Sequence, residues 1–62
     1  MANQITVGKK HKILKDTPTP NGMLYKDDTV VVTELIGDRT ARVEDMIGRI
    51  FHISPRLLEV IV

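Results

Sequence analysis

Apolar and polar residues alternate along much of the chain, and more than half of the apolar positions are valine or isoleucine. The clearest segment runs from Thr29 to Ile36 and contains three consecutive valines. β-Branched side chains lose χ1 freedom in a helix and pack well on a pleated sheet. The pattern therefore predicts a strand over residues 29–36.

A hairpin is predicted to follow this strand. Gly37-Asp38 suits a tight two-residue turn between antiparallel strands, because glycine readily adopts the positive φ that such turns need. The second arm is predicted over Arg39 to Asp45, with Ala41 and Val43 facing inward. The next turn is expected at Met46-Ile47-Gly48.

The C-terminal part predicts two further strands with one helical turn between them. Arg49 to Ile53 has strand character, and Glu59 to Val62 returns to it. Between them, Ser54 can accept a hydrogen bond from an amide of the first turn, and Pro55 suits the first helical position because its missing amide proton costs nothing there. One helical turn is therefore expected at residues 54–58.

The N-terminal part predicts a first strand and a long connection. Lys10 to Lys15 is the expected strand, and Ile5 and Val7 lead into it. Asp16 to Asp28 contains two prolines, an Asn-Gly pair and paired aspartates, which predict a long irregular loop or an open hairpin.

The inward positions of these strands form a small predicted core. A domain of this length buries only about 60% of the surface that its unfolded chain exposes, so few residues are expected in it. They are Val7, Ile13, Leu14, Val30, Val32, Leu35, Val43, Ile50, Phe51, Ile53, Leu58 and Val60.

The order of these elements resembles the SH3-like barrel. Asp16 to Asp28 matches the place of the RT loop, and Thr29 to Ile36 matches the strand after it. Gly48 to Ile61 is similar to the end of such barrels, where a glycine opens a strand, a 3-10 turn follows and a Leu-Glu-like pair begins the last strand. The resemblance implies an all-β fold, a small five-stranded, partly open SH3-like barrel with one short 3-10 turn, in which residues 1–62 form a single domain.

Two branches of this superfamily suggest different partners. Signalling SH3 domains bind proline-rich peptides through a patch of aromatic residues, but Tyr25 and Phe51 are the only aromatic residues of this chain, so that mode is not expected. KOW and Tudor-like domains include binders of RNA and of transcription or ribosomal proteins. Val7 to Ile13 looks like the basic opening of a KOW-type barrel, although the rest of that motif is not found after Lys15.

Composition indicates the cellular compartment in which the protein is expected to act. The chain has no cysteine, a formal charge of +1, no basic segment followed by an apolar run at its start, and no apolar stretch near the ~20 residues of a membrane helix. We expect a cytoplasmic protein with no membrane partner.

No arrangement of residues predicts catalysis, a metal site or a cofactor. His11 and His52 have no second histidine at ligand spacing, and adjacent strand or loop residues such as Asp27 and Asp28 usually point in opposite directions. Gly8-Lys9-Lys10 lacks the spaced glycines of a phosphate-binding loop. The chain is therefore expected not to be an enzyme.

The leading hypothesis is a small protein-interaction module or regulator, of a kind that suits a bacterial or phage accessory protein. Large, mainly apolar side chains inside the polar loop are its candidate partner-binding residues: Met23, Leu24 and Tyr25. These side chains either form a contact patch or fold back as a lid on the core.

Two alternatives remain. A nucleic-acid-binding barrel is expected to use six basic residues, which otherwise form a solubilising surface: Lys9, Lys10, Lys12, Arg39, Arg42 and Arg49. A structural module is expected to pair an exposed strand edge, for example at Ile61-Val62, with a second copy as a homodimer or with a partner strand.

Overall fold

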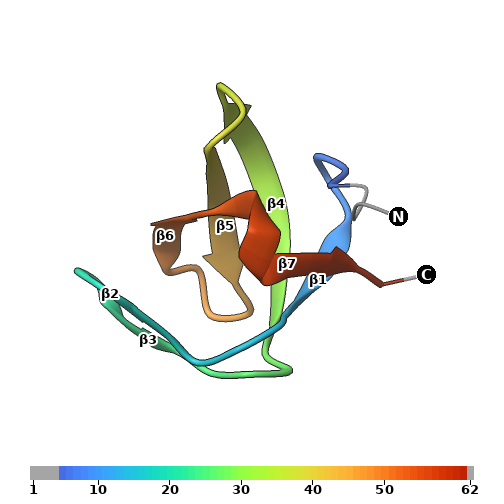
Figure 1. Cartoon of the computed structure of the whole chain (residues 1–62). Helices are drawn as coiled ribbons and strands as arrows, with labels where there is room; N and C mark the ends of the chain where they lie inside the picture. The colour runs from blue at the N-terminus through green and yellow to red at the C-terminus, as the bar shows by residue number, and fades with distance from the viewer. Residues whose placement is uncertain (1–4, 62) are drawn as a thin grey trace.

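The computed structural model describes residues 5–61, which form short strands and one 3-10 helix (Figure 1). In chain order the elements are β1 (Lys10–Ile13), β2 (Thr17–Thr19), β3 (Gly22–Leu24), β4 (Thr29–Ile36), β5 (Thr40–Asp45), β6 (Ile50–Ile53), η1 (Pro55–Leu57) and β7 (Leu58–Val60).

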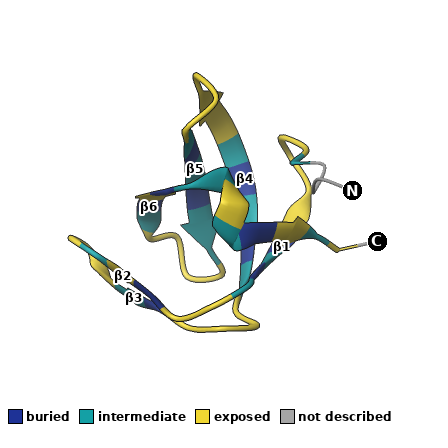
Figure 2. Ribbon diagram, viewed as in Figure 1, coloured by how far each residue is buried: buried dark blue, intermediate teal, exposed yellow. Residues whose placement is uncertain are grey.

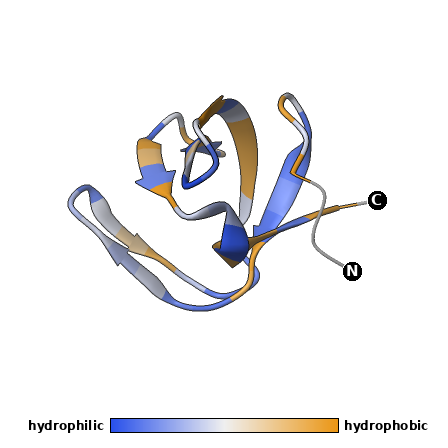
Figure 3. Ribbon diagram, turned by 45° about the horizontal axis from the view of Figure 1, so that its top comes forward, coloured by the Kyte–Doolittle hydropathy of each residue, from blue (hydrophilic) through white to orange (hydrophobic). Residues whose placement is uncertain are grey.

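Five of the strands form one antiparallel sheet in the order β6-β5-β4-β1-β7, and β2 and β3 form a separate hairpin. The predicted all-β fold of five main strands with one short 3-10 turn is confirmed. The strand predicted over residues 29–36 has the same bounds as β4. Figure 3 shows the hydrophobic character that runs along this strand, in contrast to the hydrophilic β1.

The sheet is strongly curved because its two edge strands are consecutive in the chain. Edge strands of a flat five-stranded sheet lie about 19 Å apart. Only residues 54–57 join β6 to β7, and even a fully extended link from Ile53 to Leu58 spans at most about 18 Å. Three of the four linking residues are in η1, where the rise is only about 2 Å per residue. The sheet must therefore bend so that its edges approach each other, and its inner face becomes concave.

The segment predicted as a loop or open hairpin, Asp16 to Asp28, contains the β2–β3 hairpin, which projects beside β6 (Figure 1). At its tip, the Asn21 side-chain amide donates a hydrogen bond of 2.8 Å to the Ile50 carbonyl. At its base, the Lys26 amide donates to an Asp16 carboxylate oxygen at 2.8 Å. The first bond therefore attaches the tip to β6, and the second closes the base of the hairpin.

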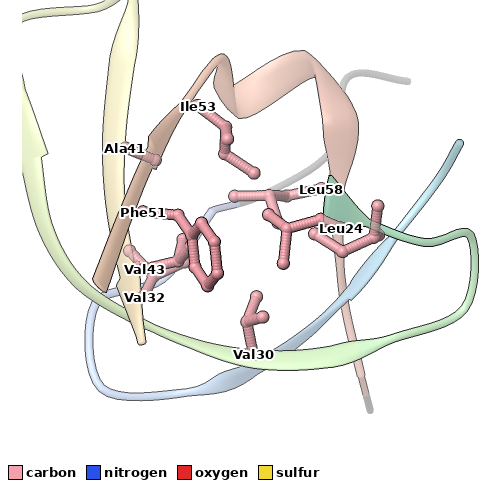
Figure 4. Packing of buried hydrophobic residues seen from close by; sticks show 9 residues of the cluster. Leu24, Val30, Val32, Ala41, Val43, Phe51, Ile53 and Leu58 are labelled. Atoms are coloured by element: carbon pink, nitrogen blue, oxygen red, sulfur yellow. The ribbon is translucent and has the colours of Figure 1, made fainter. Parts of the chain in front are cut away.

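The core lies between the concave face of the sheet and this hairpin. Figure 2 shows buried positions alternating along the strands, and Figure 4 shows their side chains converging from β3, β4, β5, β6 and β7. The buried apolar residues are Ile13, Leu24, Val30, Val32, Ala41, Val43, Phe51, Ile53 and Leu58.

Several residues predicted for the core lie elsewhere. Val7 precedes β1 and is 51% exposed, so its assignment to the core was wrong. Leu35 is 40% exposed, although it lies opposite the buried Ala41. Pairing between β1 and β4 ends at Val31, so within residues 5–61 no strand flanks Leu35 on that side. Three other residues predicted for the core are half-buried rather than fully buried: Leu14, Ile50 and Val60.

Two local predictions have different outcomes. The β4–β5 turn has three residues rather than two, because Ile36 pairs with Thr40 and leaves Gly37, with φ +64°, together with Asp38 and Arg39 in the turn. The predicted cap of the helical turn is confirmed, since the Ser54 hydroxyl oxygen accepts a hydrogen bond of 3.3 Å from the Arg56 amide.

His11 is a fully buried polar residue within the first strand. Its Nε2 accepts a hydrogen bond of 3.2 Å from the Thr6 amide, and its Nδ1 lies 2.9 Å from the Lys9 carbonyl oxygen. A ring nitrogen that accepts carries no proton, and one that faces a carbonyl must donate. His11 is therefore neutral with its proton on Nδ1, and it joins the segment before β1 to the core.

The substitution His11→Leu should destabilise the protein by about 1–3 kcal/mol, because it removes the partner of the Thr6 amide and the donor to Lys9. Equilibrium urea unfolding measures the change in free energy.

The matched control is His52→Leu, because His52 is exposed on β6. A surface substitution of this kind should change the free energy of unfolding by at most about 0.5 kcal/mol. Equal effects of the two substitutions would contradict a structural role for the His11 ring.

Candidate protein-interaction surface

The predicted partner-binding triplet is divided between the core and the surface. Leu24 is 2% exposed and points into the core beside Leu58 (Figure 4). Met23 is half-buried, and Tyr25 is 57% exposed where the chain leaves β3. The alternation of β3 explains this division, since neighbouring strand residues face opposite sides. Of the two arrangements expected for these side chains, Leu24 therefore adopts the lid on the core and not an exposed patch.

The turn from β5 to β6 lies at the same end of the molecule as the connection from β3 to β4, residues 25–28, which contains Tyr25 (Figure 1). One carboxylate organises it. Asp45 Oδ1 accepts hydrogen bonds from the amides of Ile47, at 3.0 Å, and Arg49, at 2.8 Å. Asp45 Oδ2 accepts from Arg49 Nε at 2.7 Å. Gly48 provides the positive φ of +89° that the turn requires.

Two large apolar side chains are exposed on this turn. Met46 is 64% exposed and Ile47 is 77% exposed, and the turn is drawn as exposed in Figure 2. The carboxylate of Asp45 and the backbone of Gly48 set the turn, so its conformation does not depend on the side chains of Met46 and Ile47. A solvated turn favours polar residues at such positions. The exposed apolar pair therefore makes this turn a candidate contact surface.

A pocket of about 240 Å³ opens between this turn and the start of β4. Leu24 and Val30 provide buried apolar side chains at its base, while Asp28 and Arg49 provide charge. The complete lining is Leu24, Asp28, Thr29, Val30, Asp45, Met46, Ile47 and Arg49. We call Tyr25, Met46, Ile47 and this pocket the apolar surface.

Asp45 and Arg49 give this surface a stable charged border. Although desolvation acts to raise it, the pKa of the Asp45 carboxyl lies below its ordinary value of 3.8, because the Arg49 amide and side chain and the Ile47 amide favour the charged form. The Arg49 guanidinium carbon also lies 5.6 Å from the centroid of the Phe51 ring. Arg49 therefore has a structural role in this turn.

The structure does not bring the six predicted nucleic-acid-binding residues into one patch. Lys10, Lys12 and Arg42 lie on the outer face of the sheet, since the residues next to them in β1 and β5 are buried. Arg49 lies at the apolar surface, Arg39 lies in the turn at the opposite end of β5, and Lys9 precedes β1.

Acidic residues are interleaved with the basic residues of the outer face. Lys12 pairs with Glu59 across β1 and β7, with Nζ and Oε1 3.5 Å apart. Arg42 lies opposite Glu34, and its guanidinium donates to Thr33 Oγ1 at 2.8 Å. Such a mixed face lacks the continuous positive potential that follows a nucleic-acid backbone.

Within residues 5–61, no three histidine or acidic side chains gather in a group that could hold a metal ion. None of the helical segments in this range has the length and apolar character needed to cross a membrane.

Comparison of the chain with known protein families, with curated proteins and with solved structures gives no match.

Sequence reasoning identified Tyr25 but missed Met46 and Ile47, which it interpreted only as a turn. A signal was present, because two large apolar residues directly precede the turn glycine, Gly48, where polar residues are common. Their proximity to the loop that contains Tyr25 depends on the register of β4 and β5, in which Val30 lies opposite Asp45.

Asp45 should contribute an acid-sensitive part of the stability. Its folded-state pKa lies below the unfolded value, so its contribution is fully present above about pH 4 and is lost as the pH falls through the folded-state value. Thermal unfolding of the wild type and of Asp45→Asn, measured from neutral to strongly acidic pH, should give stabilities that converge in acid. Parallel pH profiles would contradict this role.

Proposed function

We propose that this chain is a small, non-catalytic protein-interaction module of the SH3-like superfamily, and that it binds its partner through the apolar surface. The exposure of Met46 and Ile47 on a turn whose shape does not need them is the observation that carries this proposal. Cytoplasmic action as a bacterial or phage accessory protein belongs to the same proposal, in keeping with a chain that has no cysteine.

The chemistry of the apolar surface favours a protein partner. Tyrosine, methionine and arginine are enriched at protein interfaces, and contacts that dominate affinity are usually large side chains surrounded by polar groups. Tyr25, Met46 and Ile47 provide the apolar contacts, and Asp28 and Arg49 provide polar groups beside them. An apolar side chain of the partner would enter the pocket and contact Leu24 and Val30.

The turn also has a low entropic cost of binding. Asp45 holds the backbone of residues 47 and 49 through its carboxylate before any partner arrives. Less backbone freedom is then lost in the complex, and preorganisation of this kind increases affinity. The nucleic-acid alternative has less support, because Lys12 and Arg42 are paired on a face that also carries Glu34, Glu44 and Glu59.

The test compares three immobilised proteins as baits in a lysate of the source cells. The first is the wild type, and the second carries Tyr25→Ser, Met46→Ser and Ile47→Ser. The matched control replaces three exposed apolar residues elsewhere: Leu35→Ser, Ile36→Ser and Ile61→Ser.

A protein retained by the wild type and by the control should be lost from the second bait. Purified with that partner, the apolar-surface variant should bind at least about tenfold more weakly, since truncation of one dominant contact costs about 2 kcal/mol. Equal retention by all three baits, or loss with the control alone, would contradict this assignment of the surface.

A further inference from the structure

A second depression lies at the opposite end of β5 from the apolar surface. It is a groove of about 490 Å³ lined by Asp38, Arg39, Ser54 and Arg56. Asp38 and Arg39 belong to the three-residue turn between β4 and β5, while Ser54 and Arg56 belong to the cap and the body of η1. Its volume is within the range of about 300–1,000 Å³ that is typical of ligand sites.

The two arginines of this groove have no partner for their guanidinium groups among residues 5–61. Ion pairs in that range join Lys12 to Glu59 and Arg49 to Asp45, and no hydrogen bond in it involves the guanidinium group of Arg39 or of Arg56. Both residues are exposed. Asp38 is the one acidic residue in the lining, so the groove has an excess of positive charge.

Ser54 adds a further donor between the two arginines. Its oxygen accepts a hydrogen bond of 3.3 Å from the Arg56 amide, which leaves the hydroxyl proton available to another acceptor. A guanidinium group presents planar paired donors that match the two oxygens of a carboxylate. The groove therefore offers donors from two separate segments and only one competing carboxylate.

We propose that this groove binds a short acidic segment of a protein partner, with Arg39 and Arg56 each receiving a carboxylate and the Ser54 hydroxyl donating to one of them. This site is separate from the apolar surface and does not depend on the function proposed for it. The turn of Asp38 and the turn of Met46 lie at opposite ends of β5, whose six residues span about 20 Å.

An acidic peptide fits the groove better than a nucleic acid does. No aromatic side chain lines the groove, so bases have nothing to stack on. The neighbouring Arg42 is bonded to Thr33, and the lysines of β1 lie on the mixed outer face. Two arginines that line one groove and have no guanidinium partner within residues 5–61 match a short run of carboxylates rather than an extended phosphate backbone.

Asp38 provides a second, independent test of the proposed site. Its carboxylate repels an acidic ligand, so Asp38→Asn should tighten binding. Exposed charge pairs contribute up to about 1 kcal/mol, which corresponds to an increase in affinity of up to about fivefold.

The experiment follows the amide spectrum of the full chain, isotope-labelled and at low salt, during titration with a blocked octapeptide of alternating aspartate and glutamate. A peptide of alternating asparagine and glutamine and a short thymidine oligonucleotide are the comparison probes. The variants are Arg39→Gln with Arg56→Gln, the single change Asp38→Asn, and the charge-matched control Lys15→Gln with Lys26→Gln.

The acidic peptide should shift the amides of residues 38, 39, 54 and 56, and raised salt should weaken the binding. The double arginine variant should lose about tenfold or more in affinity, because each charged hydrogen bond contributes substantially. The lysine control should change affinity by less than about threefold.

Four results would overturn the proposal. They are shifts centred on Lys9 to Lys12, equal losses in the arginine and lysine variants, tighter binding of the oligonucleotide than of the acidic peptide at the groove, and weaker binding by Asp38→Asn. The apolar-surface variant should bind the acidic peptide as the wild type does, so failure of this proposal and failure of the proposed function are distinguishable.

Discussion

The four residues between β6 and β7 impose the main constraint on this small protein. They join the two opposite edges of a five-stranded sheet, and a flat sheet would place those edges too far apart for so short a link. The resulting curvature creates the concave face on which Phe51 and the valines of β4 and β5 pack. The β2–β3 hairpin then covers this face with Leu24. Ser54 and Pro55 are suited to the link, because they start the compact 3-10 turn that shortens it.

A core this small cannot tolerate polar groups without partners, and the chain satisfies its own backbone with side chains. The buried ring of His11, in β1, forms hydrogen bonds with the Thr6 amide and the Lys9 carbonyl, which both precede this strand. At the surface, aspartate side chains satisfy backbone donors, because the carboxylates of Asp45, Asp28 and Asp16 accept hydrogen bonds from nearby amides. At the β5–β6 turn, the Asp45 carboxylate holds the backbone, so the turn does not need the side chains of Met46 and Ile47. Their exposure is the observation on which the proposed contact with a partner rests.

The two depressions at the ends of β5 differ in chemistry. The apolar surface combines a buried apolar base with a charged border that is already paired, since Arg49 binds Asp45. The groove beside η1 has an excess of unpaired positive charge from Arg39 and Arg56. Apolar contact contributes mainly to affinity, whereas complementary charge contributes mainly to partner choice and association rate. The two proposed sites together would give a chain of 62 residues two kinds of recognition.

The sequence by itself determined the features that depend on near neighbours. A run of β-branched residues predicts β4, glycine marks the turns, and Ser54-Pro55 predicts η1. The tertiary structure decided which residues meet across long separations. Burial of His11 and Leu24 depends on curvature and on the position of the hairpin, and exposure of Leu35 depends on where β1 ends. Arg39 and Arg56 line the same groove because the short β6–β7 link places η1 near the β4–β5 turn. The β3–β4 connection, with Tyr25, lies at the same end of the molecule as Met46 because Val30 pairs with Asp45. Local patterns do not contain that register, since it results from packing of the whole core.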